Sequence, residues 1–175
     1  DVEPITWNMD VSQLESKITP RTAAIMVVHI YGLPVDMDIV MEIARRRGLK
    51  IIEDSAEQIG QIYFSKSGSN HKVGSFGDVA TFSFYPNKQV TTGEGGMVLT
   101  SQDLLAEKCR DLRNLCFGKV SRFVHEDLGW NFRMSNLQAA VGVAQMERLH
   151  ETLNKKRKIG AWYDELLDTI DVIER

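Results

Sequence analysis

Two apolar runs of strand length, with an amphipathic segment between them, shape the first third of the chain. Residues 23–30 (AAIMVVHI) form a continuous apolar run, which is typical of a strand covered on both faces. Residues 49–53 predict the next strand. Between these runs, Ile39, Val40 and Ile43 recur at helical spacing. A strand, a helix and a strand within about thirty residues form a βαβ unit, so we expect the two strands to be parallel.

The middle of the chain predicts two further strands around a glycine-rich loop with one lysine. Residues 79–84 (VATFSF) favour a pleated strand, and Pro86 with Asn87 ends the run. Lys88 follows at once, and the turn at 91–96 (TTGEGG) leads into the second strand. A poorly solvated lysine at a strand end is a good nucleophile toward carbonyls. A solvated lysine in a hairpin connection fits the same residues.

Helical periodicity predicts most of the remaining elements. The composition of residues 61–77 is that of a loop with a weak strand at best, and residues 114–127 look irregular. Ser135 and Gln138 have the spacing of a capping box. The predicted helices cover residues 12–17, 36–47, 100–115, 135–148 and 150–167. The predicted packed face of the fourth helix consists of small or apolar residues: Ala139, Ala140, Val143 and Met146.

Composition excludes several classes of partner. A net charge of −3 gives no reason to expect nucleic acid or an anionic membrane surface as a partner. No apolar run approaches the length of a bilayer span. Cys109 and Cys116 fit neither a metal motif nor a disulfide framework, so a reduced, cytoplasmic environment is expected. The chain begins at Asp1 rather than methionine, and we expect it to be part of a longer protein.

Polar side chains gather where the predicted strands end. His29 and Asp54 lie at the ends of the first two strands, and Ser83 shortly precedes Lys88. Ligands of parallel sheets bind at the carboxyl ends of strands. Pyridoxal phosphate requires an amine for a Schiff base, a carboxylate for its pyridine nitrogen, and hydroxyl or backbone groups for its phosphate. Simpler roles remain open, because Asp54 could cap a turn and Ser83 could bond to backbone.

Four segments, in order along the chain, resemble one known family. They are HIYGLPVDMD (29–38), EDSAEQIG (53–60), GSFGDVATFSFYPNKQVTTGEGGMV (74–98) and GWNFRMSNLQAAVGVAQMERL (129–149). Over roughly residues 20 to 165 the chain resembles the DegT/DnrJ/EryC1/StrS sugar aminotransferases, and within that family the perosamine synthetases. The resemblance implies an α/β fold: the large domain of a fold type I pyridoxal-phosphate enzyme, with a mostly parallel sheet flanked by helices. Residues 1–165 would belong to that domain and residues 166–175 would lead to a small C-terminal domain.

The resemblance also implies roles for individual residues around the cofactor. Lys88 corresponds to the Schiff-base lysine, which also moves protons at the substrate carbon. Asp54 corresponds to the partner of the pyridine nitrogen, and Ala56 would pack against the ring. Glu57 matches a position near the ring hydroxyl, and Ser83 matches a phosphate-binding hydroxyl.

Two further assignments reach beyond the cofactor ring. Asn131 matches an asparagine that contacts the phosphate of the neighbouring subunit, which implies a homodimer with shared active sites. Its simpler interpretation is a loop side chain. His29 is placed in the substrate-binding set, as a packed or ring-stacking residue rather than a proton shuttle.

The implied reaction is transamination of a nucleotide-linked 4-keto-6-deoxy sugar, with an amino acid such as glutamate as donor. Such sugars are built into surface polysaccharide. Four alternatives stay open: a sugar 3-aminotransferase of the same family, a dehydratase of the same family, a non-catalytic scaffold or regulatory domain that keeps the fold, and a plain α/β ligand-binding domain. Lys88 argues against the dehydratase, in which histidine replaces the lysine.

Overall fold

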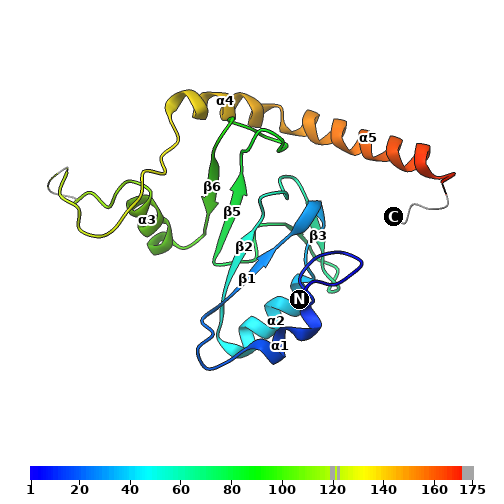
Figure 1. The fold of residues 1–175 in the computed structure, drawn as a ribbon, viewed down its shortest axis with the longest axis horizontal. Coiled ribbons are helices and arrows are strands. Elements are labelled where there is room, and N and C mark those ends of the chain that lie inside the picture. The colour runs from blue at the N-terminus through cyan, green and yellow to red at the C-terminus, as the bar shows by residue number, and fades with distance from the viewer. Residues whose placement is uncertain (119–120, 122, 171–175) are drawn as a thin grey trace.

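A four-stranded sheet organises the chain in the computed structural model, which describes residues 1–118, 121 and 123–170 (Figure 1). Its order is β1 (Ala24–Val28), β2 (Lys50–Asp54), β5 (Val79–Ser83) and β6 (Gly96–Leu99). The pairs β1–β2 and β2–β5 are parallel, whereas β6 runs antiparallel to β5. The expected mostly parallel α/β sheet is confirmed.

The predicted βαβ unit is present, and its helix ends where the sequence indicates. Helix α2 (Met37–Arg47) begins at Asp36, whose side chain accepts the Ile39 N–H. It ends at Gly48, which has a left-handed φ of 65°. Glycine adopts this conformation without the steric cost that a β-carbon brings.

The hydrophobic core lies on one face of the sheet only. It is formed by β1, β2 and α2, and its buried residues are Ile25, Val27, Val35, Met37, Val40, Ile43, Ala44 and Ile51. On the other face of β1, Met26 and Val28 are 57% and 43% exposed. Within the described residues, α1 (Leu14–Lys17) and α2 cover one face of this strand (Figure 1).

Residues 61–77 contain more structure than their loop-like composition predicts. Strands β3 (Ile62–Phe64) and β4 (Asn70–Lys72) pair as an antiparallel hairpin. Tertiary contacts stabilise this hairpin: the Ser65 hydroxyl donates to Asp38 at 2.7 Å, and the Tyr63 ring meets Phe76 edge-on at 5.3 Å. Such partners are distant in sequence and leave no periodic signal.

Helix α3 (Asp103–Leu112) begins after the predicted residue 100 and ends before the predicted residue 115. The expected capping box of Thr100 and Asp103 is wrong, because the helix begins after Gln102 and no side chain among the described residues caps it. Leu115 and Cys116 have positive φ values of 64° and 49°, so the backbone there turns away from the helical direction. Short 3-10 segments, η1 (Val11–Gln13) and η2 (Ile30–Gly32), precede α1 and follow β1.

Helix α4 (Asn136–Glu147) contacts the rest of the chain through a different face from the predicted one. Its capping box of Ser135 and Gln138 is confirmed. Yet Val143 and Met146 are 61% and 48% exposed, and no residue of the helix is buried. The contacting face instead carries Gln138, Gly142 and Gln145, which follow helical spacing.

Helix α5 (Leu149–Leu167) continues end to end from α4 (Figure 1). Within the described ranges, no helix is both long and apolar enough to span a bilayer. Residues 166 and 167 of the predicted interdomain connection belong to α5. Residues 171–175 of that connection lie outside the described residues, and the domain boundary stays a prediction.

Candidate active site

The register of the sheet brings the predicted site residues to one edge. Val28 pairs with Asp54 across β1 and β2, and Asp54 pairs with Thr81 across β2 and β5. Ser83 lies two residues beyond Thr81, at the carboxyl end of β5. The loop that carries Lys88 follows directly. The carboxyl edge of the parallel strands thus gathers a carboxylate, a hydroxyl and an amine, as expected.

Lys88 is held by a carboxylate from the neighbouring strand end. Its backbone N–H donates to the Tyr85 carbonyl at 3.0 Å. Its Nζ lies 3.0 Å from Glu57 Oε1, and its side chain is 15% exposed. The other carboxylate oxygen of Glu57 accepts the Tyr31 N–H at 2.7 Å. The hydrogen bond from the Lys88 side chain lowers the pKa of the Glu57 carboxyl, so this carboxyl stays ionised at neutral pH.

The side chains of Asp54 and Ser83 each accept one hydrogen bond from the backbone, and each can still make another. Asp54 Oδ1 accepts the Ala56 N–H at 3.1 Å, and the structure records no partner for Oδ2 among the described residues. Ser83 Oγ accepts the Tyr85 N–H at 3.2 Å, which leaves its hydroxyl hydrogen free to donate. This edge of the sheet therefore presents three groups to a ligand. The carboxylate oxygen suits a cationic nitrogen, the hydroxyl suits an anion, and the amine suits a carbonyl.

His29, which the sequence places in the substrate-binding set as a packed or ring-stacking residue, is packed inside the protein. It is 1% exposed. Its Nδ1 accepts the Val35 N–H at 3.0 Å, so its ring hydrogen is assigned to Nε2, which lies 3.3 Å from Glu53 Oε2. The Nε2 atom of Gln58 donates a hydrogen bond to the backbone carbonyl of His29 at 3.0 Å. Both ring nitrogens are thus engaged inside the protein, and His29 braces the end of β1.

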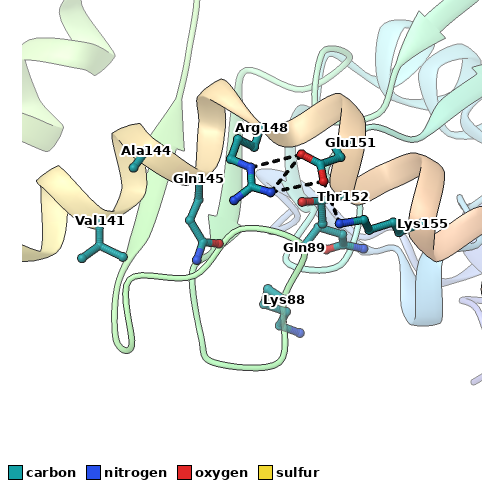
Figure 2. A pocket seen from close by; sticks show the side chains of 9 residues that line it. All are labelled: Lys88, Gln89, Val141, Ala144, Gln145, Arg148, Glu151, Thr152 and Lys155. Carbon is teal, nitrogen blue, oxygen red and sulfur yellow. Dashed lines mark hydrogen bonds and ion pairs between the residues drawn. The ribbon is translucent and has the colours of Figure 1, made fainter.

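Two cavities open beside Lys88. The smaller, of about 220 Å³, is lined by Tyr31, Gly32, Glu57, Asn87, Lys88 and Gln89. The larger, of about 560 Å³, lies between Lys88, Gln89 and the helices α4 and α5. Figure 2 shows Gln145 of α4 pointing toward the Lys88 loop, where its Oε1 accepts the Thr91 N–H at 3.0 Å.

Several of these lining residues were missed by sequence reasoning. Tyr31 and Gly32 read only as a turn, and Gln89 offered no signal beyond its place next to Lys88. No role was predicted for the polar residues of α4 and α5. The spacing of Gln138, Gly142 and Gln145 was the available clue, since two amides and a glycine on one face suit contact with backbone.

Asn131 lies apart from these cavities in its own chain. It forms an isolated bridge with Asn114, just after α3. It lines neither cavity beside Lys88. The described parts of the chain contain no group of three or more histidine, cysteine, aspartate or glutamate side chains arranged for a metal ion.

Comparison with known proteins assigns the family. The profile of the DegT/DnrJ/EryC1/StrS aminotransferase family matches residues 1–175. The chain belongs to this family. The implied resemblance is thereby confirmed, and so is the fold class.

Relatives within this aminotransferase family extend well beyond the chain. It is 48% identical, over 95% of its length, to the GDP-perosamine synthase of Caulobacter vibrioides, of which it covers 44%. The sugar aminotransferase CalS13 of Micromonospora echinospora superposes on all of it with a TM-score of 0.86, at 32% identity and 49% coverage of CalS13. PseC of Helicobacter pylori, an aminotransferase involved in pseudoaminic acid biosynthesis, superposes on 95% of it with a TM-score of 0.85, at 29% identity and 44% coverage. The chain thus spans less than half of these relatives.

Proposed function

We propose that the protein carrying this chain is a pyridoxal-phosphate-dependent aminotransferase of nucleotide-linked keto sugars, with Lys88 as the residue that binds the cofactor covalently. The observation that carries the proposal is the Lys88 amine, 15% exposed and paired with Glu57, at the sheet edge that also carries Asp54 and Ser83. Family membership supports the same conclusion.

The groups at this edge fit the cofactor one by one. Pyridoxal phosphate supplies an aldehyde that condenses with amines and a protonated ring that withdraws electrons from the substrate carbon. The free oxygen of Asp54 would pair with the ring nitrogen, and the Ser83 hydroxyl would donate to the phosphate. Ala56, whose side chain is a single methyl group, would contact the ring face. Glu57 would lie near the ring hydroxyl, and the Lys88 amine would move protons at the substrate carbon.

The sugar and its partners are the finer part of the proposal. The 48% identity to a GDP-perosamine synthase supports a GDP-linked 4-keto-6-deoxy sugar as acceptor, with glutamate as amino donor and surface polysaccharide as the destination. We place the enzyme in the cytoplasm, where it would meet both the nucleotide-linked sugar and glutamate. An acceptor with the ketone at carbon 3 is the alternative within the same reaction. A non-catalytic scaffold would not need a paired, poorly exposed lysine beside two cavities.

Covalent trapping tests the cofactor assignment directly. The protein is incubated with pyridoxal phosphate, reduced with borohydride, digested and analysed by mass spectrometry. We expect the label on the peptide that contains Lys88, and its loss in Lys88→Ala. Lys66→Ala is the matched control, because Lys66 is also paired with a carboxylate, Asp36, but is 71% exposed. Label spread over exposed lysines, or retained in Lys88→Ala, would contradict the assignment.

A mixing experiment tests the shared active site. Asn131 of one subunit is proposed to complete the phosphate site of its partner in a homodimer. Lys88→Ala and Asn131→Ala subunits should each be inactive alone, and mixed dimers should regain part of the wild-type transamination because one of their two sites is intact. A monomeric active enzyme, or mixed dimers without activity, would refute the sharing of residues.

A further inference from the structure

Tyr31 has a backbone conformation that is unusual for its residue type. It follows β1, at the centre of η2, with φ 49° and ψ 31°. A bulky residue rarely occupies the left-handed region, because its β-carbon crowds the following carbonyl. Gly32 is next to it and itself has a φ of 86°. Strain of this kind persists only where surrounding contacts over-determine the backbone, and it concentrates at functional sites.

Hydrogen bonds around this turn hold the backbone of Tyr31 in its unusual conformation. Buried Asn8 brackets it: its Oδ1 accepts the Ile30 N–H at 3.0 Å, and its Nδ2 donates to the Leu33 carbonyl at 2.9 Å. The Tyr31 N–H itself donates to Glu57 at 2.7 Å. Since Glu57 also holds the amine of Lys88 at 3.0 Å, one carboxylate ties the strained turn to the reactive lysine.

The Tyr31 side chain has no comparable anchor. The residue is 80% exposed, and no ring or side-chain partner is recorded for it among the described residues. It lines the smaller cavity together with Lys88, Glu57 and Asn87. The fold therefore fixes the backbone of Tyr31 beside the smaller cavity and leaves a large aromatic face available to a ligand.

We propose that Tyr31 positions the acceptor substrate, with its ring as the wall against which the sugar ring lies while the sugar carbonyl reaches the Lys88 site. This inference rests on the proposed function. The carbon–hydrogen face of a pyranose ring is apolar and suits an aromatic surface. An acidic amino donor suits the position less well, because the cation of this cavity, Lys88, is already paired with a carboxylate.

Substitution with glycine separates this role from a role in folding. Tyr31→Gly removes the ring and also relieves the positive φ, so the variant should melt no lower than wild type. Tyr31→Phe keeps the aromatic face and serves as the conservative rescue. Phe64→Ala is the matched control, because Phe64 is an aromatic residue of β3 that is 73% exposed and lines neither cavity.

The first measurement is equilibrium binding of a GDP-linked 4-keto-6-deoxyhexose to the full-length protein without amino donor, so that no turnover occurs. We expect Tyr31→Gly to weaken binding about tenfold, with Tyr31→Phe and Phe64→Ala close to wild type. In turnover, KM for the sugar should rise by a similar factor, with little change in kcat or in KM for glutamate. Borohydride labelling of Lys88 should be unchanged.

The outcomes separate this inference from the proposed function. Wild-type sugar affinity in Tyr31→Gly would overturn the role of Tyr31 while leaving Lys88 labelling intact. Loss of Lys88 labelling in Tyr31→Gly would also overturn it, because Tyr31 would then act on the cofactor. Absence of label in wild type would refute the proposed function, and the sugar affinities would still decide the role of Tyr31.

Discussion

Replacing Glu53 with glutamine probes the most heavily bonded buried carboxylate described in the chain. Glu53 is 0% exposed. Its oxygens accept the backbone N–H groups of Gly74, Phe76 and Gly77 at 2.9, 2.7 and 2.5 Å, and the His29 ring at 3.3 Å. The carboxylate thereby joins the loop before β5 to the end of β1. Glutamine keeps one acceptor oxygen but turns an NH₂ group toward groups that can only donate.

The size of the effect follows from these four donors. A hydrogen bond to a charged group contributes about 1.5–3 kcal/mol, and a buried donor left without its acceptor costs about 1–3 kcal/mol. We therefore expect Glu53→Gln to lower the free energy of unfolding by about 3–5 kcal/mol. The assay is urea unfolding followed by circular dichroism. The control is Glu151→Gln, because Glu151 is also paired with two cations but is exposed; it should show no measurable loss of stability.

Acid titration adds a second check on Glu53. Burial raises the pKa of its carboxyl, but the hydrogen bonds from His29 and from the three backbone N–H groups together lower it below 4.5. The stabilisation is therefore fully present above about pH 4.5 and is lost as the pH falls through the lower pKa of the folded state. The stability difference between wild type and Glu53→Gln should shrink in that range. A glutamine variant as stable as the Glu151 control, or a difference independent of acid pH, would refute the reasoning.

Two further predictions concern helix packing and alkaline stability. Gly160→Ala in α5, where a β-carbon meets nothing within 4 Å, should stabilise the protein by about 1 kcal/mol in urea unfolding; Gly142→Val should destabilise it, because a β-carbon there would lie 2.9 Å from Thr92. The reverse order would contradict the observed contact of α4. Burial, reinforced by the Asp36 carboxylate, raises the pKa of Tyr63 to about 12, so its stabilisation is complete below pH 10 and is lost as the pH rises toward 12. Tyr63→Phe should flatten this alkaline decline, and an unchanged pH profile would count against the raised pKa.

Much of the fold follows from interactions between residues close in sequence. Asp36 and Gly48 delimit α2 as predicted because capping depends on the adjoining backbone. Ser135 begins α4 for the same reason. Strand lengths and the βαβ order follow from apolar runs, and their parallel pairing is a consequence of the crossover helix. Asp54, Ser83 and Lys88 reach one edge because strand ends in such a sheet coincide.

The pairs of side chains that are distant in sequence could not be predicted, because the register of the sheet and the packing bring them together. His29 pairs with Glu53, 24 residues away, and Glu57 joins Lys88 to Tyr31; no local pattern distinguishes these partners from other polar residues. The same limit explains the hairpin of β3 and β4, which depends on contacts with Asp38.

The exposed faces show the limit of periodicity most clearly. An apolar pattern on α4 or β1 states which side chains would gain by burial, but the rest of the chain determines which face is covered. Here α4 contacts its neighbours through Gln138, Gly142 and Gln145, and β1 is covered on one face only. The sequence by itself thus determined most of the elements and the family, whereas the tertiary structure decided which groups meet, since contact is a property of distance in space rather than of spacing along the chain.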